Sequence, residues 1–411
     1  MAKAVIQKKF RKNPFEELSL LLDIPDLEQV FPRRHLESWR RFDPLKLLPV
    51  MSDSARHGIS PSKITLTEPD SAKTHFLTNN LKTANEWKKQ DEVFLQKARN
   101  HLKHFKTNND AAFFENLITK SVSEDHLHIL KLSKNETHDQ IPAIEISASH
   151  PEHLNFHIFY IYAEESSKAS INLVKKSGAC DMAIIYVFQE KNSDIRLRYL
   201  DENSQPSQAV HFIKYHQEIG STSKSGIYSI CASQNKKIFI ENNLLQGAVA
   251  EFSGLFLGRY SHVDNDFLVN HAESFSRSSL LFKMSTIDES YGIFWGNVEI
   301  APNTRGCEAY QQNKNLILGN NSRVDAIPRL AIHTENVLAA HGSATGEISE
   351  DEIFYMMSRG LGYAEARKLL LRGFFEDVLR KSFEHDPDQP DLFLERIWLN
   401  IQKILGDEIS L

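Results

Sequence analysis

The stretch NVEIAPNTRGCEAYQQNKNLILGNNSRVDAIPRLAIHTENVLAAHGS, residues 297–343, decides the fold. About every dozen residues in it, an apolar run gives way to a polar corner of Asn, Asp, Ser or Gly. Short β-rich runs of the same kind fill residues 141–345, among them ASINLV, DMAIIYVFQ and KIFIEN. No helical segment separates these runs, which disfavours a doubly wound α/β fold. A sandwich, a barrel and a stacked β-solenoid stay open, and the imperfect recurrence favours the solenoid.

The two flanks of this β-rich zone have a helical pattern. In NPFEELSLLLDIPDLEQV (13–30) and NEWKKQDEVFLQKARNHLKHF (85–105), apolar residues recur three and four apart, as in amphipathic helices. After the zone, Ser349 and Glu352 have the spacing of a capping box that opens a helix. We therefore expect three domains: a mostly helical one at 1–140, a β core at 141–345 and a helical one at 346–411.

Composition and charge limit the classes of function. Hydrophobic residues make up 41% of the chain and charged residues 25%, as is usual for a soluble globular protein. A net charge of -6 argues against wholesale nucleic-acid binding. No apolar run approaches the roughly 20 residues of a membrane span, and the start MAKAVIQKKFRKNPFEELS lacks a signal-peptide core. Three widely spaced cysteines suggest no disulfide framework, so we expect a cytoplasmic protein without a membrane partner.

Several motifs that suggest chemistry fail on inspection. GSTSKSG (220–226) precedes a strand pattern rather than the helix that a phosphate loop requires. The histidines at 150, 153 and 157 would share a face only in a helix, and a strand is expected there, which makes a metal site improbable. HGSATG is not the G-x-S-x-G motif of serine hydrolases. Asp264, Asp266 and Glu273 are the nearest carboxylate cluster for a β-helix carbohydrate-active enzyme, and that alternative stays open.

His341 has two interpretations. It is either a turn residue at the end of the β zone or a metal ligand whose fellow ligands come from another molecule, since one imidazole cannot hold a metal alone. Considered by its chemistry alone, the turn residue is favoured.

The second half of the chain resembles a known family. AYQQNKNLILG (309–319), VDAIPRLAI (324–332), the HG turn at 341–342, DEIFYMMSRG (351–360) and EARKLLLRGFF (365–375) are similar to the C-terminal signature of the SufB/SufD family of iron–sulfur cluster assembly proteins. FPRRHLESWRRFDPL (31–45) resembles a stretch typical of SufD-type members. Asn313 stands where SufB-type chains carry a cysteine, so the chain is identified as SufD-like.

The resemblance implies a mainly β fold, a right-handed parallel β-helix between N-terminal and C-terminal helical domains. It implies a non-enzymatic scaffold subunit that pairs with a SufB-like paralogue through the β-helix and with a SufC-like ATPase through the C-terminal helices. The residues expected to dock the ATPase are Phe354, Tyr355, Met357, Arg359, Leu370, Phe374 and Phe375.

The resemblance also assigns a role to His341, near the interface with SufB and beside a SufB cysteine, in the formation of nascent clusters. No tightly bound cofactor is expected, only transient iron or an iron–sulfur cluster at that interface. A homodimeric β-helix scaffold acting without SufB is the remaining alternative.

Overall fold

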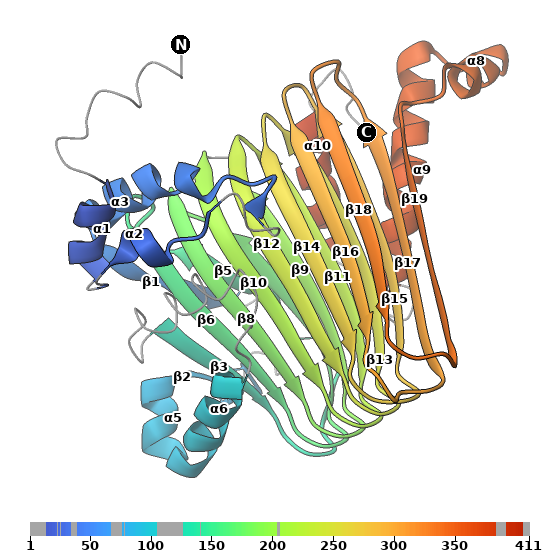
Figure 1. Cartoon of the computed structure of the whole chain (residues 1–411). Helices are drawn as coiled ribbons and strands as arrows, with labels where there is room; N and C mark the ends of the chain where they lie inside the picture. Colours follow the sequence, from blue (N-terminus) through green and yellow to red (C-terminus); the bar gives the residue numbers. More distant parts are fainter. Residues whose placement is uncertain are drawn as a thin grey trace.

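The computed structural model describes residues 14–22, 24, 26–33, 39–66, 76–77, 79–104, 126–139, 141–203, 206–383 and 392–405. Its body is a parallel β-solenoid of about eight turns with helices at both ends of the chain (Figure 1). The predicted fold class, a parallel β-helix flanked by helices, is therefore confirmed. The right-handed sense of the coil and the domain limits stay predictions.

Each turn of the solenoid contributes one strand to each of two facing sheets. Sheet A contains β6 (Leu154–Ala163), β8 (Cys180–Gln189), β10 (Ser207–Gln217), β12 (Gln234–Leu244), β14 (His262–His271), β16 (Tyr291–Ile300) and β18 (Arg323–Ile332). Sheet B contains β7 (Lys168–Lys176), β9 (Asp194–Asn203), β11 (Thr222–Ala232), β13 (Val249–Arg259), β15 (Arg277–Ile287), β17 (Cys307–Ile317) and β19 (Val337–Gly346). Lys168 pairs with Asp194 and Tyr291 with Arg323, so one turn takes 26 to 32 residues. The spacing of about a dozen residues seen in the sequence is thus half a turn.

One corner of the solenoid is built the same way in successive turns. Ser166, Asn192 and Gly220 all have positive φ angles, a conformation that Gly and Asn tolerate best. The backbone N–H of Asn192 donates to the carbonyl of Ile219 at 3.1 Å, and that of Gly220 to Gln246 at 3.0 Å. These bonds link each corner to the next, so the turns stack in register.

The N-terminal residues form helices and also extend the first end of the solenoid. The helical segments are α1 (Pro14–Leu22), α2 (Leu27–Val30), η4 (Pro44–Lys46), α3 (Leu48–His57), α5 (Ala84–Gln90) and α6 (Glu92–His104). The strands are β1 (Ile59–Leu66), β2 (Leu81–Thr83), β3 (Leu127–Leu132), β4 (Thr137–His138) and β5 (Ile144–Ala148). Both β1 and β3 pair in parallel with β6, so the first turn is covered. Residues 34–38 of the SufD-type stretch lie outside the described residues.

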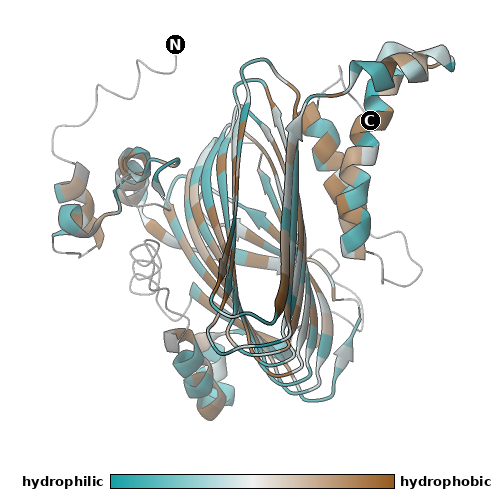
Figure 2. Ribbon diagram, turned by 45° about the vertical axis from the view of Figure 1, so that its right-hand side comes forward, coloured by the Kyte–Doolittle hydropathy of each residue, from teal (hydrophilic) through white to brown (hydrophobic). Residues whose placement is uncertain are grey.

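The helices cover the outer faces of the two sheets. Aromatic side chains of the N-terminal part, such as Trp39 and Phe42, pack with Tyr160, Tyr186 and Phe212 on the outer face of sheet A. The C-terminal helices α9 (Tyr363–Phe383) and α10 (Leu392–Leu405) pack on the outer face of sheet B. Figure 2 shows the two groups of helices on opposite sides of the solenoid. The side chains between the sheets form a third apolar core.

The helix α8 (Glu350–Ser358) follows β19 and projects away from the solenoid (Figures 1 and 2). Ser349 Oγ accepts the N–H of Glu352 at 3.2 Å, which confirms the serine half of the predicted capping box. Among the helices that the structure describes, none is long and apolar enough to cross a membrane.

Candidate functional site at the open end of the solenoid

The last turn of the solenoid has two free strand edges. β18 pairs with β16 and β19 pairs with β17, and within the described residues no further strand pairs with either. Side chains on these strands are largely exposed, as with Leu338 at 59% and Ile332 at 40%. Backbone N–H and C=O groups along a free edge can pair with a strand of another molecule.

His341 lies within β19 at this open end and pairs with Gln311 of β17. The expectation that it is a turn residue is therefore wrong, because the stretch of small residues around it continues the strand. Side chains alternate along a strand, so His341 shares the inward side with Val337 and Ala339, which pack on the buried Cys307 and Ala309. His341 is exposed. No hydrogen bond to its ring is formed by the part of the chain that the structure describes.

A ladder of buried amides lies directly below the last strand. Asn313 Nδ2 donates to the carbonyl of Phe282 at 3.1 Å, and Asn313 Oδ1 accepts from Ser343 Oγ at 3.4 Å. Asn315 Nδ2 donates to Asn313 Oδ1 at 2.6 Å and to Thr345 Oγ1 at 3.0 Å. These bonds tie the inward side of β19 to β17, so the strand that carries His341 is held on one edge by side chains as well as backbone.

His341 by itself offers one metal ligand. In the described residues, no three His, Cys, Asp or Glu side chains are placed to hold a metal ion. The cysteines Cys180, Cys231 and Cys307 are buried. Burial raises the pKa of the Cys180 thiol, and it raises the pKa of Cys231 to about 11, which disfavours the thiolate that would bind iron. Iron or a cluster held at His341 would need further ligands from another molecule.

The histidines at 150, 153 and 157 do not form a site together. The ring of His157 is fully buried inside the solenoid beside His128, with 5.2 Å between their ring centres. His153 Nδ1 is 2.7 Å from Ser60 Oγ, and its ring centre is 4.5 Å from that of His150.

The carboxylates of the carbohydrate-active alternative differ in burial: Asp264 is buried, Asp266 is half-buried and Glu273 is exposed. Asp264 and Asp266 lie beneath the N-terminal segment, 3.0 and 3.3 Å from Lys237 Nζ. Burial raises the pKa of Asp264 to about 6 and also raises the pKa of Asp266. Glu273 lies at a corner, where it accepts the backbone N–H of Gln246. A glycosidase needs two carboxyl groups facing an open substrate site, and this arrangement does not provide one.

The residues predicted to dock an ATPase separate into two groups. On α8, Phe354 is 73% exposed, Tyr355 59% and Met357 44%, and the Arg359 guanidinium lies 5.1 Å over the Tyr355 ring. We call these four residues the α8 surface. The others, Leu370, Phe374 and Phe375, lie on α9, where Leu370 and Phe374 are half-buried and Phe375 is fully buried against sheet B.

Phe375 therefore belongs to the core, and we leave it out of the docking surface. Sequence reasoning missed the exposed Tyr363 and Leu369 on α9. Tyr363 and Leu369 would have been found if they had been assigned to the solvent face of α9. The sequence alone does not indicate which face of the helix packs on the sheet.

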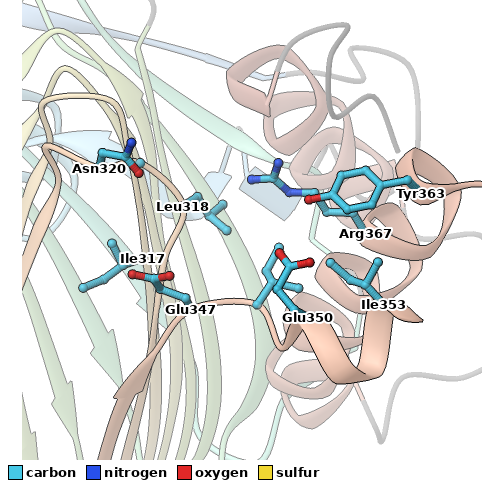
Figure 3. A pocket seen from close by; sticks show the side chains of 10 residues that line it. Ile317, Leu318, Asn320, Glu347, Glu350, Ile353, Tyr363 and Arg367 are labelled. Carbon is cyan, nitrogen blue, oxygen red and sulfur yellow. The ribbon is translucent and has the colours of Figure 1, made fainter. Parts of the chain in front are cut away.

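A cavity of about 150 Å³ lies where the solenoid meets the C-terminal helices (Figure 3). Its walls include Leu318 and Asn320 after β17, Glu347 after β19, and Glu350 and Arg367 from the helices. The cavity thus lies between the last strands of the solenoid and the first residues of the C-terminal helices.

Comparison with known proteins agrees with this architecture. A family model described as "SUF system FeS cluster assembly, SufBD core domain" matches residues 144–374. An iron–sulfur cluster assembly SufBD family protein of Mycobacterium leprae is 36% identical over 144 residues, which cover 33% of this chain and 37% of that relative. The iron–sulfur cluster assembly protein SufD of Escherichia coli (strain K12) is 29% identical over 110 residues, which cover 27% of this chain and 26% of that protein.

The matched stretches thus span roughly a third of the length of these relatives, whereas the family model covers more than half of the chain. The chain therefore belongs to the SufB/SufD family of iron–sulfur cluster assembly proteins, as its C-terminal motifs predicted.

Proposed function

We propose that this chain is a SufD-like, non-catalytic scaffold subunit of a cytoplasmic iron–sulfur cluster assembly complex. Its partners would be a SufB-like paralogue and a SufC-like ATPase, and together they would support cluster formation and iron acquisition. The observation that carries the proposal is the open end of the solenoid, where two free strand edges flank an inward-facing histidine.

Pairing with a second β-helix would satisfy the backbone groups of β18 and β19. The edge of a sheet binds an added strand through main-chain hydrogen bonds, and a paralogue with the same repeat has strands of matching length. The α8 surface is the proposed dock for the ATPase, because its aromatic and Met side chains are exposed beside Arg359. Exposed aromatic residues with an arginine are typical of binding hot spots.

In this proposal, His341 supplies one half of a shared site. Neutral imidazole is a good ligand for iron, and among the described residues no group of three candidate ligands is placed to hold a metal ion. The SufB-like partner would supply the remaining ligands, and iron or the nascent cluster would be the cargo rather than a resident cofactor.

Co-expression tests the assembly. Tagged full-length chain is expressed with its cognate SufB-like and SufC-like proteins, and a stable complex is expected to co-purify. Recovery of the chain without either protein would overturn the proposal. If the chain instead sediments as a dimer of itself and captures neither protein, the self-complementary free edges would favour the homodimeric scaffold.

A histidine pair tests the site within the complex. His341→Ala is expected to leave the complex assembled but to lower the transfer of iron–sulfur clusters to an apo-ferredoxin at least tenfold. His333→Ala, a nearby exposed histidine just beyond β18, is the control and should transfer normally. Equal transfer by the two variants would remove His341 from the site.

A further inference from the structure

The side chain of Gln311 crosses the solenoid one level below His341. Gln311 belongs to sheet B, yet its Nε2 donates to the backbone carbonyl of Gly296 in sheet A at 3.0 Å. Gln311 is 5% exposed. Only the amide nitrogen can donate to a carbonyl, so the orientation of this amide is fixed by chemistry. Its oxygen, Oε1, is buried without a hydrogen-bond partner among the described residues.

Gly296 provides the space for this amide. A Cβ added to Gly296 would lie 2.5 Å from Gln311 Oε1 and 2.7 Å from Phe294 Cζ. The φ angle of Gly296 is not positive, so the missing side chain, rather than an unusual backbone, is what this position requires. The Gln311 amide therefore lies in contact with the opposite sheet, in the space that a side chain at Gly296 would fill.

The next level of the solenoid places His341 above this amide. Gln311 pairs with His341 in sheet B, and Gly296 pairs with Pro328 in sheet A. Side chains of paired residues on neighbouring strands stand side by side, about 4.8 Å apart at the backbone. Pro328 carries no polar side-chain atom to meet His341 across the solenoid, whereas Gln311 has a buried acceptor without a partner.

We propose that Gln311 is the positioning residue of His341, with Oε1 accepting the N–H of one imidazole nitrogen. A buried acceptor without a partner is unfavourable, so this bond would stabilise both groups. Fixing one ring nitrogen selects the tautomer and directs the other nitrogen outward through the open end. The positioning itself needs no partner; only its use for iron or a cluster rests on the proposed function.

The imidazole tautomer provides the direct test, on the isolated full-length chain. Histidine-selective ¹⁵N labelling with long-range ¹H–¹⁵N correlation reports the tautomer of each ring, and His341→Ala identifies the signals of His341. The wild type is expected to show one dominant tautomer. Gln311→Met, which keeps the length of the side chain, should give the mixture of tautomers that a histidine has in an unfolded peptide. Gln312→Met, whose side chain faces outward and is exposed, is the matched control and should match the wild type.

A second variant covers the case in which Gln311→Met does not fold. Gly296→Ala keeps the glutamine but pushes its amide away, so it is expected to give the same mixture of tautomers. A His341 spectrum that matches the wild type in a folded Gln311→Met or Gly296→Ala protein overturns the proposal, as does a wild-type ring with both tautomers equally populated.

The complex then separates this inference from the proposed function. With the SufB-like and SufC-like proteins, Gln311→Met is expected to assemble normally and to lower cluster transfer about tenfold, less than the loss in His341→Ala. If no complex forms with the wild type, the proposed function fails while the tautomer result still decides whether Gln311 positions His341.

Discussion

The two ends of the solenoid are built from the same strand repeat but have opposite surfaces. At the first end, every residue of β6 is buried, because β1 and β3 pair with its edge and the N-terminal helices cover its face. At the last end, β19 is exposed along almost its whole length. A repeat structure needs a cap wherever its stacking stops. This chain has a cap of its own at one end, and we infer that the other end is completed by a partner.

The two free edges at the last end also differ from each other. β18 carries Pro328 and the charged Arg323, Asp325 and Arg329, which are common devices against unwanted strand pairing. β19, with the sequence VLAAHGSATG, contains no Lys, Arg, Asp, Glu or Pro. An unprotected edge in a folded protein is an aggregation hazard unless something covers it, so β19 is the edge that we expect a partner strand to pair with.

The largest difference between the ends should appear in stability. Ile161 of β6 is fully buried in the core between the sheets, whereas Leu338 of β19 is 59% exposed. Ile161→Ala is expected to lower the free energy of unfolding by about 2–5 kcal/mol, because it leaves a cavity in a packed core. Leu338→Ala should change it by less than about 0.5 kcal/mol. Urea unfolding measures the free energy of unfolding of each variant. Similar decreases in the two variants would mean that the two ends do not differ in packing.

Association should distinguish the two free edges. The outward-facing Ala340 and Ala344 of β19 are exposed, as is Ala331 of β18. The double variant Ala340→Lys with Ala344→Lys is expected to bind the SufB-like partner about 100-fold more weakly, equivalent to about 2.7 kcal/mol, because lysines along an edge oppose strand pairing.

Ala331→Lys is the control on the other edge and should bind within about threefold of the wild type. Titration calorimetry or interferometry with the purified partner measures the affinities. If the β19 double variant and Ala331→Lys weaken binding to the partner equally, β19 is not the preferred edge.

The buried histidine at the covered end predicts an acid-sensitive stability. Burial lowers the pKa of His157 well below the usual 6.5, with nearby His128 and Lys175 acting in the same direction and Asp181 against it. In the unfolded chain this histidine takes up a proton below about pH 6.5, whereas in the folded chain it stays neutral, so stability is lost as the pH falls. The loss is at most about 1.4 kcal/mol for each pH unit between the pKa of the unfolded chain and the lower pKa of the folded chain.

His157→Leu removes this contribution without breaking a hydrogen bond, since neither ring nitrogen of His157 has a partner in the described residues. Unfolding free energies measured from pH 8 to pH 5 should therefore fall less steeply for the variant than for the wild type. Parallel curves would show that the His157 ring is not the acid-sensitive group.

The sequence predicted a solenoid, but not which residues of successive turns pair with each other. Half-turn spacing is visible in residues 297–343, and it was enough to favour a solenoid. The full repeat was missed, although Glu164, Glu190, Glu218 and Glu273 each precede a serine by three positions. In each case the serine hydroxyl donates to the glutamate carbonyl at a corner, as Ser193 does to Glu190 at 2.7 Å. A search for this Glu-x-x-Ser signal at about 27 residues would have found most of the turns.

The site was predicted in part, and the missing part has physical causes. His341 was named, but its strand was taken for a turn, because Ala, Gly and Ser around it have low β propensity. Pairing with β17 overrides that preference, and pairing partners are not encoded within the strand itself. Gln311 was missed for the same reason, since its relation to His341 and Gly296 exists only once the register is known.

The smallest expected effect on stability comes from an ion pair between the N-terminal part and β18 at the open end. Arg41 Nε lies 2.7 Å from Asp325 Oδ2 of β18, and the Arg41 guanidinium lies 5.1 Å over the Trp295 ring. Tyr291 also donates to Asp325 at 2.6 Å, and these contacts lower the pKa of the Asp325 carboxyl. Because the Arg41 and Asp325 side chains are partly exposed, Arg41→Met should cost about 1 kcal/mol or less in overall stability.

The informative measurement is local, since within the described residues no strand pairs with the other edge of β18. Hydrogen exchange of the β18 amides should become several-fold faster in Arg41→Met, while the amides of β6 keep their protection. Arg33→Met is the matched control; it removes contacts within the N-terminal part, a hydrogen bond to the Glu28 carbonyl at 2.7 Å and an ion pair with the Glu28 carboxylate at 3.9 Å. If β18 exchanges at the wild-type rate in Arg41→Met, the open end holds its shape without the N-terminal part. Faster exchange would instead mean that the helices covering the first end also set the order of the last one.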